Sequence, residues 1–350
     1  MIKDTSLQTS LKQAGQARMN HLGASGTPFL FLIDFEAKQW IVERLDAINS
    51  KDIAFNFNGK GNAMANSVLP SDKDIWFEKY PVAYARYLEA FREVVTQQRN
   101  GNSFLTNLTF PTPIATNLTL EEIFQYSSAR YKLRVSDEFV VFSPETFVQI
   151  NDGVIASCPM KGTIDANLPN AAQRILEDEK EKAEHATIVD LIRNDLSRVA
   201  SHVQVERYRY IERLTTSGKD LLQVSSRISG QLPDNHRSRL GDIFAALLPA
   251  GSISGAPKQK TLEIIAAAED YERGFYTGVC GYFDGRDVDS AVLIRFIEKT
   301  PEGLLYKSGG GITVYSDPQK EYQELLDKVY VPLHRNDQNT ERPALQSAVA

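Results

Sequence analysis

The chain has 350 residues, of which 42% are hydrophobic and 9% are aromatic, and this is enough for a large packed core. Its 39 Lys and Arg residues stand against 45 Asp and Glu residues, which leaves a net charge of −6. Because this balance provides no basic surface, the composition argues against nucleic-acid binding and against association with a membrane surface.

The longest early apolar stretch covers residues 28–33 and is too short to span a bilayer. The polar residues 1–26 before it do not resemble a signal sequence. The two cysteines, Cys158 and Cys280, are isolated from each other and from any cluster of His and Cys. One disulfide between them stays open in principle, but two isolated thiols suit a reducing compartment better. We therefore expect a cytoplasmic globular protein.

Apolar patterns predict both strands and helices along the first two hundred residues. Aromatic and aliphatic side chains recur at helical spacing between residues 84 and 95. Thr119 and Glu122 together form the signature of a capping box at the start of a helix. The predicted strands cover residues 29–33, 39–42, 138–150 and 153–157, and the predicted helices cover residues 81–98, 120–129 and 170–200.

The rest of the chain alternates between strands and helices in the same irregular way. The predicted strands cover residues 202–211, 221–228, 275–283, 288–298 and 304–307, and the predicted helices cover residues 238–248, 257–268 and 318–330. Strand pairs separated by helices, without a regular βαβ rhythm, indicate an α+β fold with large, mostly antiparallel sheets. Because no linker rich in Pro, Ser or Gly divides the chain, we expect one domain over residues 1–332 and a polar tail over residues 333–350.

Two pairs of glutamates occur on predicted helices with a spacing of three residues, Glu181 with Glu184 and Glu321 with Glu324. This spacing places both members of a pair on one face of a helix. A single pair of this kind is most often part of a solvated face. Carboxylates from two helices are also the hard oxygen ligands that Mg²⁺ prefers, so a magnesium site is the alternative.

Two glycine-rich stretches are candidates for binding an anion through the backbone. Residues 251–258 (GSISGAPK) lead into a predicted helix, but they lack the spacing of a P-loop. Residues 308–311 form a second candidate, a nest of backbone N–H groups. The plain alternative for both stretches is a turn or a helix cap.

Two basic residues also leave alternatives open. Lys161 lies on a turn between Pro159 and Gly162, where it is either a solvated charge or an amine activated as a nucleophile. Arg295 lies in a predicted apolar strand, where a guanidinium needs an acidic partner or a ligand. His185 is expected to be a core histidine, and neither cysteine has the setting of a catalytic nucleophile.

Several stretches together resemble the family of chorismate-utilising enzymes, which includes the anthranilate, aminodeoxychorismate, isochorismate and salicylate synthases. They follow the order typical of the family and occupy a motif-bearing core over residues 138–330, whereas residues 1–100 form a divergent N-terminal part. The stretches are SPETF (143–147), PMKGT (159–163), EKEKAEHATIVDLIRNDLSRV (179–199), PAGSISGAPK (249–258), RGFYTGVCGYFD (273–284), AVLIR (291–295) and GGGITVYSDPQKEYQE (309–324).

The resemblance implies a fold of two large, orthogonally packed, mostly antiparallel sheets flanked by helices. It also implies a Mg²⁺ ion held by Glu181, Glu184, Glu321 and Glu324, some of them through water. The positions that contact chorismate in the family match Thr163, Ser252, Tyr276, Arg295, Gly309, Gly310 and Gly311.

Lys161 indicates which member of the family the chain resembles most. Aminodeoxychorismate synthases of the best-studied type have a lysine in this motif, where anthranilate synthases typically have alanine. The resemblance implies that Lys161 attacks C2 of chorismate while the C4 hydroxyl leaves, protonated by Glu145. Ammonia then attacks C4 and expels the lysine, giving 4-amino-4-deoxychorismate for p-aminobenzoate and folate synthesis. Because neither cysteine has a glutaminase setting, we expect a separate glutamine amidotransferase subunit to supply the ammonia.

Two departures from the family and two alternatives accompany this interpretation. Gln223 stands where many relatives have a histidine near the substrate, and its amide cannot carry a proton. We find no convincing counterpart of the family's tryptophan-binding motif, so we do not expect feedback inhibition by tryptophan.

The alternatives are an isochorismate or anthranilate synthase, and a non-catalytic chorismate-binding subunit. Retention of Lys161, Glu145 and the four glutamates argues against the second.

Overall fold

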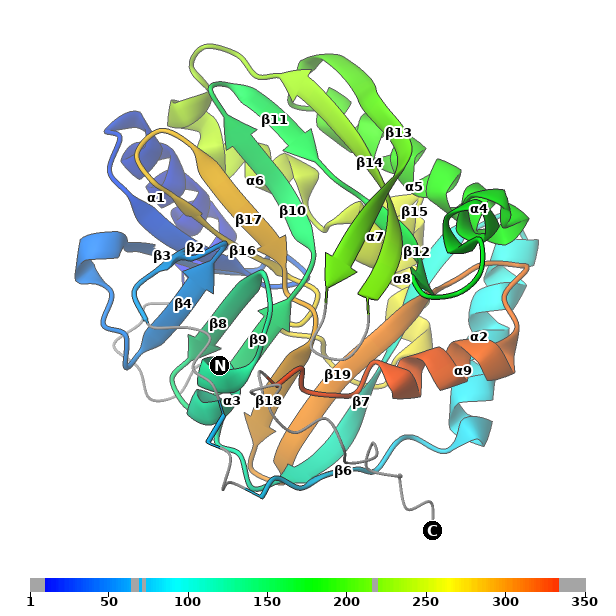
Figure 1. Ribbon diagram of the computed structural model, residues 1–350. Helices are drawn as coiled ribbons and strands as arrows, with labels where there is room; N and C mark the ends of the chain where they lie inside the picture. The colour runs from blue at the N-terminus through cyan, green and yellow to red at the C-terminus, as the bar shows by residue number, and fades with distance from the viewer. Residues whose placement is uncertain (1–9, 64–68, 71–73, 216–219, 334–350) are drawn as a thin grey trace.

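Two antiparallel sheets form the centre of the molecule in a computed structural model that describes residues 10–63, 69–70, 74–215 and 220–333 (Figure 1). The ten-stranded sheet runs in the order β1 (Ser10–Leu11), β3 (Gln39–Arg44), β2 (Phe29–Ile33), β16 (Val279–Phe283), β17 (Val288–Val292), β10 (Thr146–Asn151), β11 (Val154–Ser157), β14 (Asp220–Gln231) and β12 (Met160–Asp165), with β13 (Ser201–Thr215) also paired to β14. The nine-stranded sheet runs in the order β15 (Gly255–Ala256), β7 (Leu105–Thr116), β19 (Gly303–Ile312), β18 (Phe296–Thr300), β9 (Phe139–Ser143), β8 (Tyr131–Val135), β4 (Ile53–Phe57) and β5 (Lys60–Gly61), with β6 (Phe77–Lys79) also paired to β7.

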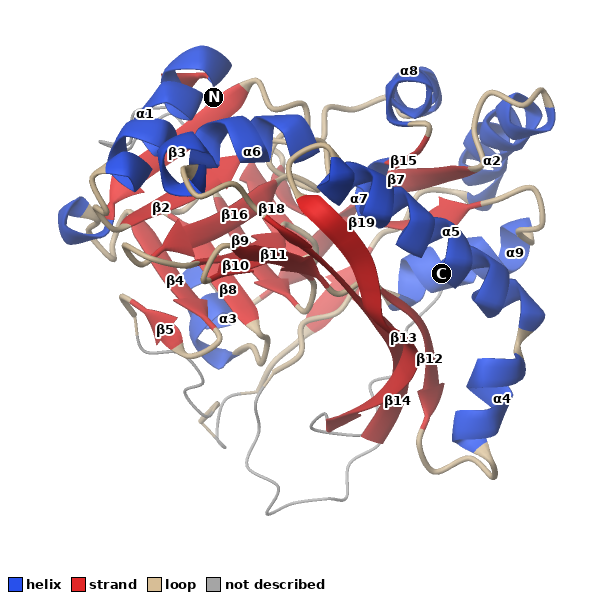
Figure 2. Cartoon of the chain, turned by 90° about the horizontal axis from the view of Figure 1, so that it is seen from above, coloured by secondary structure: helices blue, strands red, loops and turns tan. Residues whose placement is uncertain are grey.

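Helices cover the outer faces of both sheets, and Figure 2 shows α1 and α6 lying across one face of the ten-stranded sheet. The α-helices are α1 (Lys12–Ala24), α2 (Tyr84–Arg99), α3 (Leu120–Tyr126), α4 (Ala171–Glu177), α5 (Glu179–Ser197), α6 (Leu240–Leu247), α7 (Gly251–Ser254), α8 (Lys258–Ala268) and α9 (Pro318–Asp327), and short 3₁₀ turns occur at Leu45–Ala47 and His236–Arg239. The expected α+β fold with two large antiparallel sheets is confirmed. Within the described residues no helix is long and apolar enough to cross a membrane.

Strand β2 shows how one apolar run serves both faces of a sheet. Phe29, Phe31 and Ile33 belong to the core beneath α1 and α6, whereas Leu30 and Leu32 belong to the core between the two sheets. Successive side chains of a strand point to opposite faces, so an uninterrupted apolar run is what a strand buried on both faces requires. All five residues are completely buried.

The structure corrects several predicted boundaries. The strand predicted over residues 138–150 is two strands, β9 and β10, because Pro144 lies between them and a proline cannot donate to the ladder. The helix predicted over residues 170–200 is interrupted at Asp178, whose side chain accepts a hydrogen bond from the Glu181 N–H and begins a new helix. The strand predicted over residues 275–283 begins only at Val279. Most of the predicted polar tail lies outside the described residues.

A buried ion pair at the end of α8 connects this helix to β7 and to α7. A guanidinium nitrogen of Arg273 lies 2.5 Å from a Glu269 carboxylate oxygen, and both side chains are only 2% exposed. Arg273 also donates to the carbonyls of Asn107 on β7, at 2.7 Å, and Ile253 on α7, at 3.1 Å. Glu269 in turn accepts the backbone N–H of Thr109 at 2.8 Å. The pair therefore fixes α7 against the edge of the nine-stranded sheet.

Replacing Arg273 with Met is expected to lower the free energy of unfolding by about 3–5 kcal/mol, because it leaves a buried carboxylate without its cation. Urea denaturation of the two proteins measures this loss. The control is Arg44→Met, which removes an exposed ion pair to Asp46 and should leave the midpoint almost unchanged. A loss for Arg273→Met as small as that of the control would contradict the structural role of the pair.

Candidate active site

A cavity of about 240 Å³ lies where the end of the ten-stranded sheet approaches β19 of the nine-stranded sheet. The predicted site residues that line it are Glu145, Lys161, Thr163, Ser252, Tyr276, Arg295, Gly309, Gly310, Gly311 and Glu324, together with Gln223. The structure therefore brings together, from six segments of the chain, all predicted catalytic and substrate-binding positions. A second cavity of about 390 Å³, lined among others by Asn58, Arg130 and Tyr282, contains none of them.

Lys161 reaches the cavity through an irregularity in strand pairing. It lies within β12, not on a turn after a strand, and the register between β12 and β14 shifts between Met160 and Thr163. Gly162 has a φ of +80°, which a glycine adopts without strain. A bulge of this kind redirects a side chain out of the regular alternation. The Lys161 Nζ atom consequently lies 3.7 Å from the point where a Cβ on Gly311 of the other sheet would stand.

The run Gly309–Gly311 is not the backbone nest that the sequence suggested. It continues β19, and Gly309, Gly310 and Gly311 pair with Thr109, Leu108 and Asn107 of β7. These glycines matter because they lack side chains and therefore leave space in the cavity. A Cβ on Gly310 would stand 3.7 Å from Glu321 Oε2, 3.8 Å from Lys328 Nζ and 3.9 Å from Glu324 Oε1. The glycines thus keep one wall of the cavity free of side chains.

Arg295 also differs from its predicted setting. The strand predicted over residues 288–298 is two strands, β17 and β18, and Arg295 lies between them with a φ of +55°. This conformation is unusual for a residue with a side chain, and residues in such conformations cluster at functional sites. Tyr276, also on the cavity wall, is 3% exposed. Burial raises the pKa of its hydroxyl, which therefore stays protonated and able to donate a hydrogen bond.

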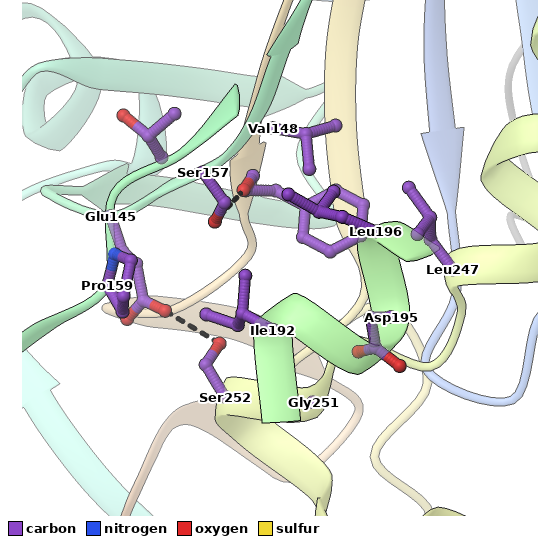
Figure 3. A pocket seen from close by; sticks show the side chains of 12 residues that line it. Glu145, Val148, Ser157, Pro159, Ile192, Asp195, Leu196, Leu247, Gly251 and Ser252 are labelled. Atoms are coloured by element: carbon purple, nitrogen blue, oxygen red, sulfur yellow. Dashed lines mark hydrogen bonds between the residues drawn. The ribbon is translucent and has the colours of Figure 1, made fainter. Parts of the chain in front are cut away.

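Glu145 lies in the short connection between β9 and β10, held by its backbone. Its carbonyl accepts the N–H of Val292 at 3.1 Å, and its own N–H donates to Ser143 Oγ at 3.1 Å. The side chain points toward α7, where Ser252 Oγ donates to Glu145 Oε1 at 2.8 Å (Figure 3). The carboxyl group is thus fixed at one oxygen and lines the same cavity as Lys161.

Lys328 is a cavity residue that the sequence analysis missed. Its Nζ atom lies 2.7 Å from Glu324 Oε1 and donates to the carbonyl of Gly309 at 2.8 Å. Burial lowers its pKa, and the positive charges of Arg295 and Lys161 lower it further, against the opposing effect of Glu324. These effects show that three cations are crowded at one end of the cavity. The sequence feature that could have identified Lys328 is its spacing of four residues from Glu324, which places both residues on the same face of a helix.

The four predicted metal ligands lie in two groups, Glu181 and Glu184 on α5 and Glu321 and Glu324 on α9. Glu181 Oε2 stands 3.1 Å from the Cβ position of Gly162, and the carboxylates of Glu321 and Glu324 stand beside Gly310. All four take part in interactions within the protein. Among the described residues no three acidic, His or Cys side chains lie close enough together to hold a metal ion. The donors suit Mg²⁺ by chemistry, but they do not form an assembled metal site.

His185 and the cysteines agree with their plain interpretations. His185 is buried, its Nε2 lies 2.6 Å from Ser226 Oγ, and burial lowers its pKa to about 4, so the ring is neutral. Both cysteines are free thiols. Burial raises the pKa of the Cys158 and Cys280 thiols, which disfavours the thiolate that a nucleophile requires.

A cavity lined by the cationic side chains of Lys161, Arg295 and Lys328, and by the carboxyl groups of Glu145 and Glu324, suits a small molecule with two negative charges. Residues 30–334 match the family model described as chorismate binding enzyme, and the chain belongs to this family. Chorismate is such a dianion.

Two relatives and one solved structure show what the chain is similar to. The chain is 50% identical over 318 residues to an uncharacterized PabA-like protein of Haemophilus influenzae, covering 91% of this chain and 96% of the relative. It is 34% identical over 264 residues to aminodeoxychorismate synthase component 1 of Salmonella typhimurium, covering 71% and 57%. Its fold is similar to that of the menaquinone-specific isochorismate synthase of Escherichia coli, with a TM-score of 0.67 at 16% identity over 92% of this chain and 82% of that one.

Replacing Lys328 with Met is expected to weaken chorismate binding about tenfold, because one of three crowded cations is lost from a partly buried site. Isothermal titration with chorismate measures the change. Lys320→Met, on the exposed side of the same helix, is the matched control and should bind as the unchanged protein does. Equal affinities of the two variants would show that Lys328 does not face the ligand.

Proposed function

We propose that this chain is an aminodeoxychorismate synthase component I, which converts chorismate and ammonia to 4-amino-4-deoxychorismate for p-aminobenzoate and folate synthesis. The observation that carries the proposal is the position of the Lys161 amine, which the bulge in β12 directs across the cavity toward Gly311. The similarity to the aminodeoxychorismate synthase component 1 of Salmonella typhimurium supports the same activity.

The reaction uses Lys161 and Glu145 in two balanced steps. In the first, the neutral Lys161 amine forms a bond to C2, both conjugated ring double bonds shift by one position, and the C4–O bond breaks as Glu145 protonates the leaving hydroxyl to give water. In the second, ammonia attacks C4 and gives up a proton to Glu145, both double bonds shift back, and the C2–N bond to Lys161 breaks. Both side chains line one cavity, as this sequence of steps requires.

Arg295, Lys328 and Tyr276 bind and orient the substrate in this proposal. The two cations offset the charges of its carboxylates, and the protonated Tyr276 hydroxyl donates a hydrogen bond. We propose that Glu181, Glu184, Glu321 and Glu324 hold Mg²⁺, which neutralises a substrate carboxylate when bound. Because these glutamates lie in two groups, water and the substrate would have to complete the ligand set.

We also propose that ammonia comes from a separate glutamine amidotransferase subunit. The support is chemical, since a glutaminase of the cysteine type needs an accessible thiolate next to a histidine. Cys280 is buried in the core between the sheets, and burial disfavours the thiolate of Cys158.

Incubation of the protein with chorismate and Mg²⁺, without ammonia, is expected to trap a covalent adduct on Lys161. Lys161→Ala should abolish the adduct and strongly reduce formation of aminodeoxychorismate, because the nucleophile is lost. Intact-protein mass spectrometry with peptide mapping detects the adduct. Lys182→Ala, which removes an exposed lysine of α5, should retain it. An adduct that survives in Lys161→Ala, or full turnover by that variant, would leave Lys161 as an electrostatic contact only.

Replacing Glu321 with Gln is expected to weaken Mg²⁺ binding at least tenfold, because the substitution keeps size but removes one anionic oxygen donor from the site. Calorimetric titration of Mg²⁺ in the presence of chorismate measures the affinity without relying on turnover. The control Glu179→Gln removes an exposed carboxylate at the start of α5 and should not change the affinity. An unchanged Mg²⁺ affinity in Glu321→Gln would remove this residue from the proposed ligand set.

A further inference from the structure

Behind Glu145 lies a third, small cavity of about 20 Å³, which has room for one water molecule. Figure 3 shows it between Glu145 and Asp195, with Ile192, Leu196 and Leu247 providing apolar walls. Glu145 and Ser252 line both this cavity and the larger one. Their hydrogen bond therefore lies where the two cavities meet.

Ser252 is held in this place by the close approach of α7 to α5. A Cβ on Gly251 would stand 3.0 Å from Asp195 Oδ2 and 2.9 Å from Leu191 Cδ2, so a larger residue here would have to displace these side chains. The guanidinium of Arg273 holds the opposite side of the same turn through the carbonyl of Ile253.

An ion pair with little exposure closes the packing around Gly251. Lys258 Nζ lies 2.7 Å from Asp195 Oδ2 and donates to the carbonyl of Leu247 at 2.7 Å. The Lys258 and Asp195 side chains are 14% and 11% exposed. One cation thus joins α5, the end of α6 and the start of α8, and α7 lies between the last two elements in the chain.

We propose that Ser252 is a positioning residue for Glu145, and that the Asp195–Lys258 ion pair holds Ser252 in place. The inference rests on the proposed role of Glu145 as the acid that protonates the leaving hydroxyl. The hydroxyl of Ser252 donates to Glu145 Oε1, which orients the carboxyl group and leaves Oε2 available to carry the acidic proton. Ser252 accordingly acts through Glu145, in place of the direct chorismate contact that the sequence suggested.

The test follows chorismate consumption across pH in unchanged protein, Ser252→Ala and Ser252→Thr. Ser252→Ala should lower kcat about tenfold or more and change the KM for chorismate less than about twofold, because orientation of the acid is lost and binding is not. The limb of the pH profile of kcat that belongs to Glu145 is identified by its absence in Glu145→Gln. This limb should move to higher pH by about one unit in Ser252→Ala, because the lost hydrogen bond had favoured the ionised carboxylate. Ser252→Thr keeps the hydroxyl and should restore both quantities.

The link to the ion pair is tested by combining variants. Asp195→Asn with Lys258→Met removes both charges together, and the fold should survive because no buried charge is left alone. This double variant should show part of the kcat loss and part of the pH shift of Ser252→Ala. The triple variant, which also has Ser252→Ala, should lose no more kcat than Ser252→Ala alone. Two matched controls should change neither quantity. They are Lys260→Met, which removes an exposed ion pair on α8, and Ser254→Ala, which removes a hydroxyl that donates to the carbonyl of Ala250.

Several outcomes would overturn the inference. A Ser252→Ala variant with an unchanged pH profile, or with a raised KM and normal kcat, would make Ser252 a substrate contact. Additive losses would show that the ion pair acts independently of Ser252. A crystal structure of Ser252→Ala in which the Glu145 carboxylate keeps its orientation would refute positioning without reference to activity. Because the assay follows chorismate and not one product, formation of isochorismate or anthranilate would contradict the proposed function while leaving this test decisive.

Discussion

The reach of Lys161 across the junction of the two sheets is the feature on which the rest of the site depends. In regular antiparallel pairing, β12 would place successive side chains alternately on the two faces of its own sheet. The register shift at Gly162 breaks this alternation, and the amine then lies against the glycine run of β19. Both sides of the contact are needed, because side chains on β19 at these positions would fill the space that the amine faces.

Charge is the second constraint on the site. Burial and the neighbouring cations lower the pKa of Lys328, which means that the positive charge of its ammonium group is disfavoured at this end of the cavity. Glu324 offsets part of it, and the carbonyl of Gly309 accepts one of the ammonium protons. An anionic ligand relieves the remaining repulsion. The arrangement therefore suits an anionic ligand.

The sequence predicted the local features of this structure better than the long-range ones. The apolar run of β2 and the capping box of Thr119 and Glu122 depend on neighbours in the chain, and the structure confirms both. The glycines at 309–311 were misassigned because their strand is completed by β7, about two hundred residues earlier, and no local pattern reveals such a partner. Arg295 was placed inside a strand because apolar residues flank it, although its backbone interrupts that strand. The family resemblance identified most cavity residues, but not Lys328, nor the partnership of Ser252 with Glu145.

The most direct test of the account is the position at which nitrogen enters the ring. A nucleophilic lysine at C2 blocks that carbon and leaves C4 open to ammonia, whereas direct attack by an external nucleophile would place the new atom at C2. The measurement is NMR of the product formed from chorismate, Mg²⁺ and ¹⁵N-labelled ammonia. The account predicts ¹⁵N bonded to C4 of 4-amino-4-deoxychorismate. Label at C2, a product that contains no nitrogen, or chorismate left unchanged would contradict it.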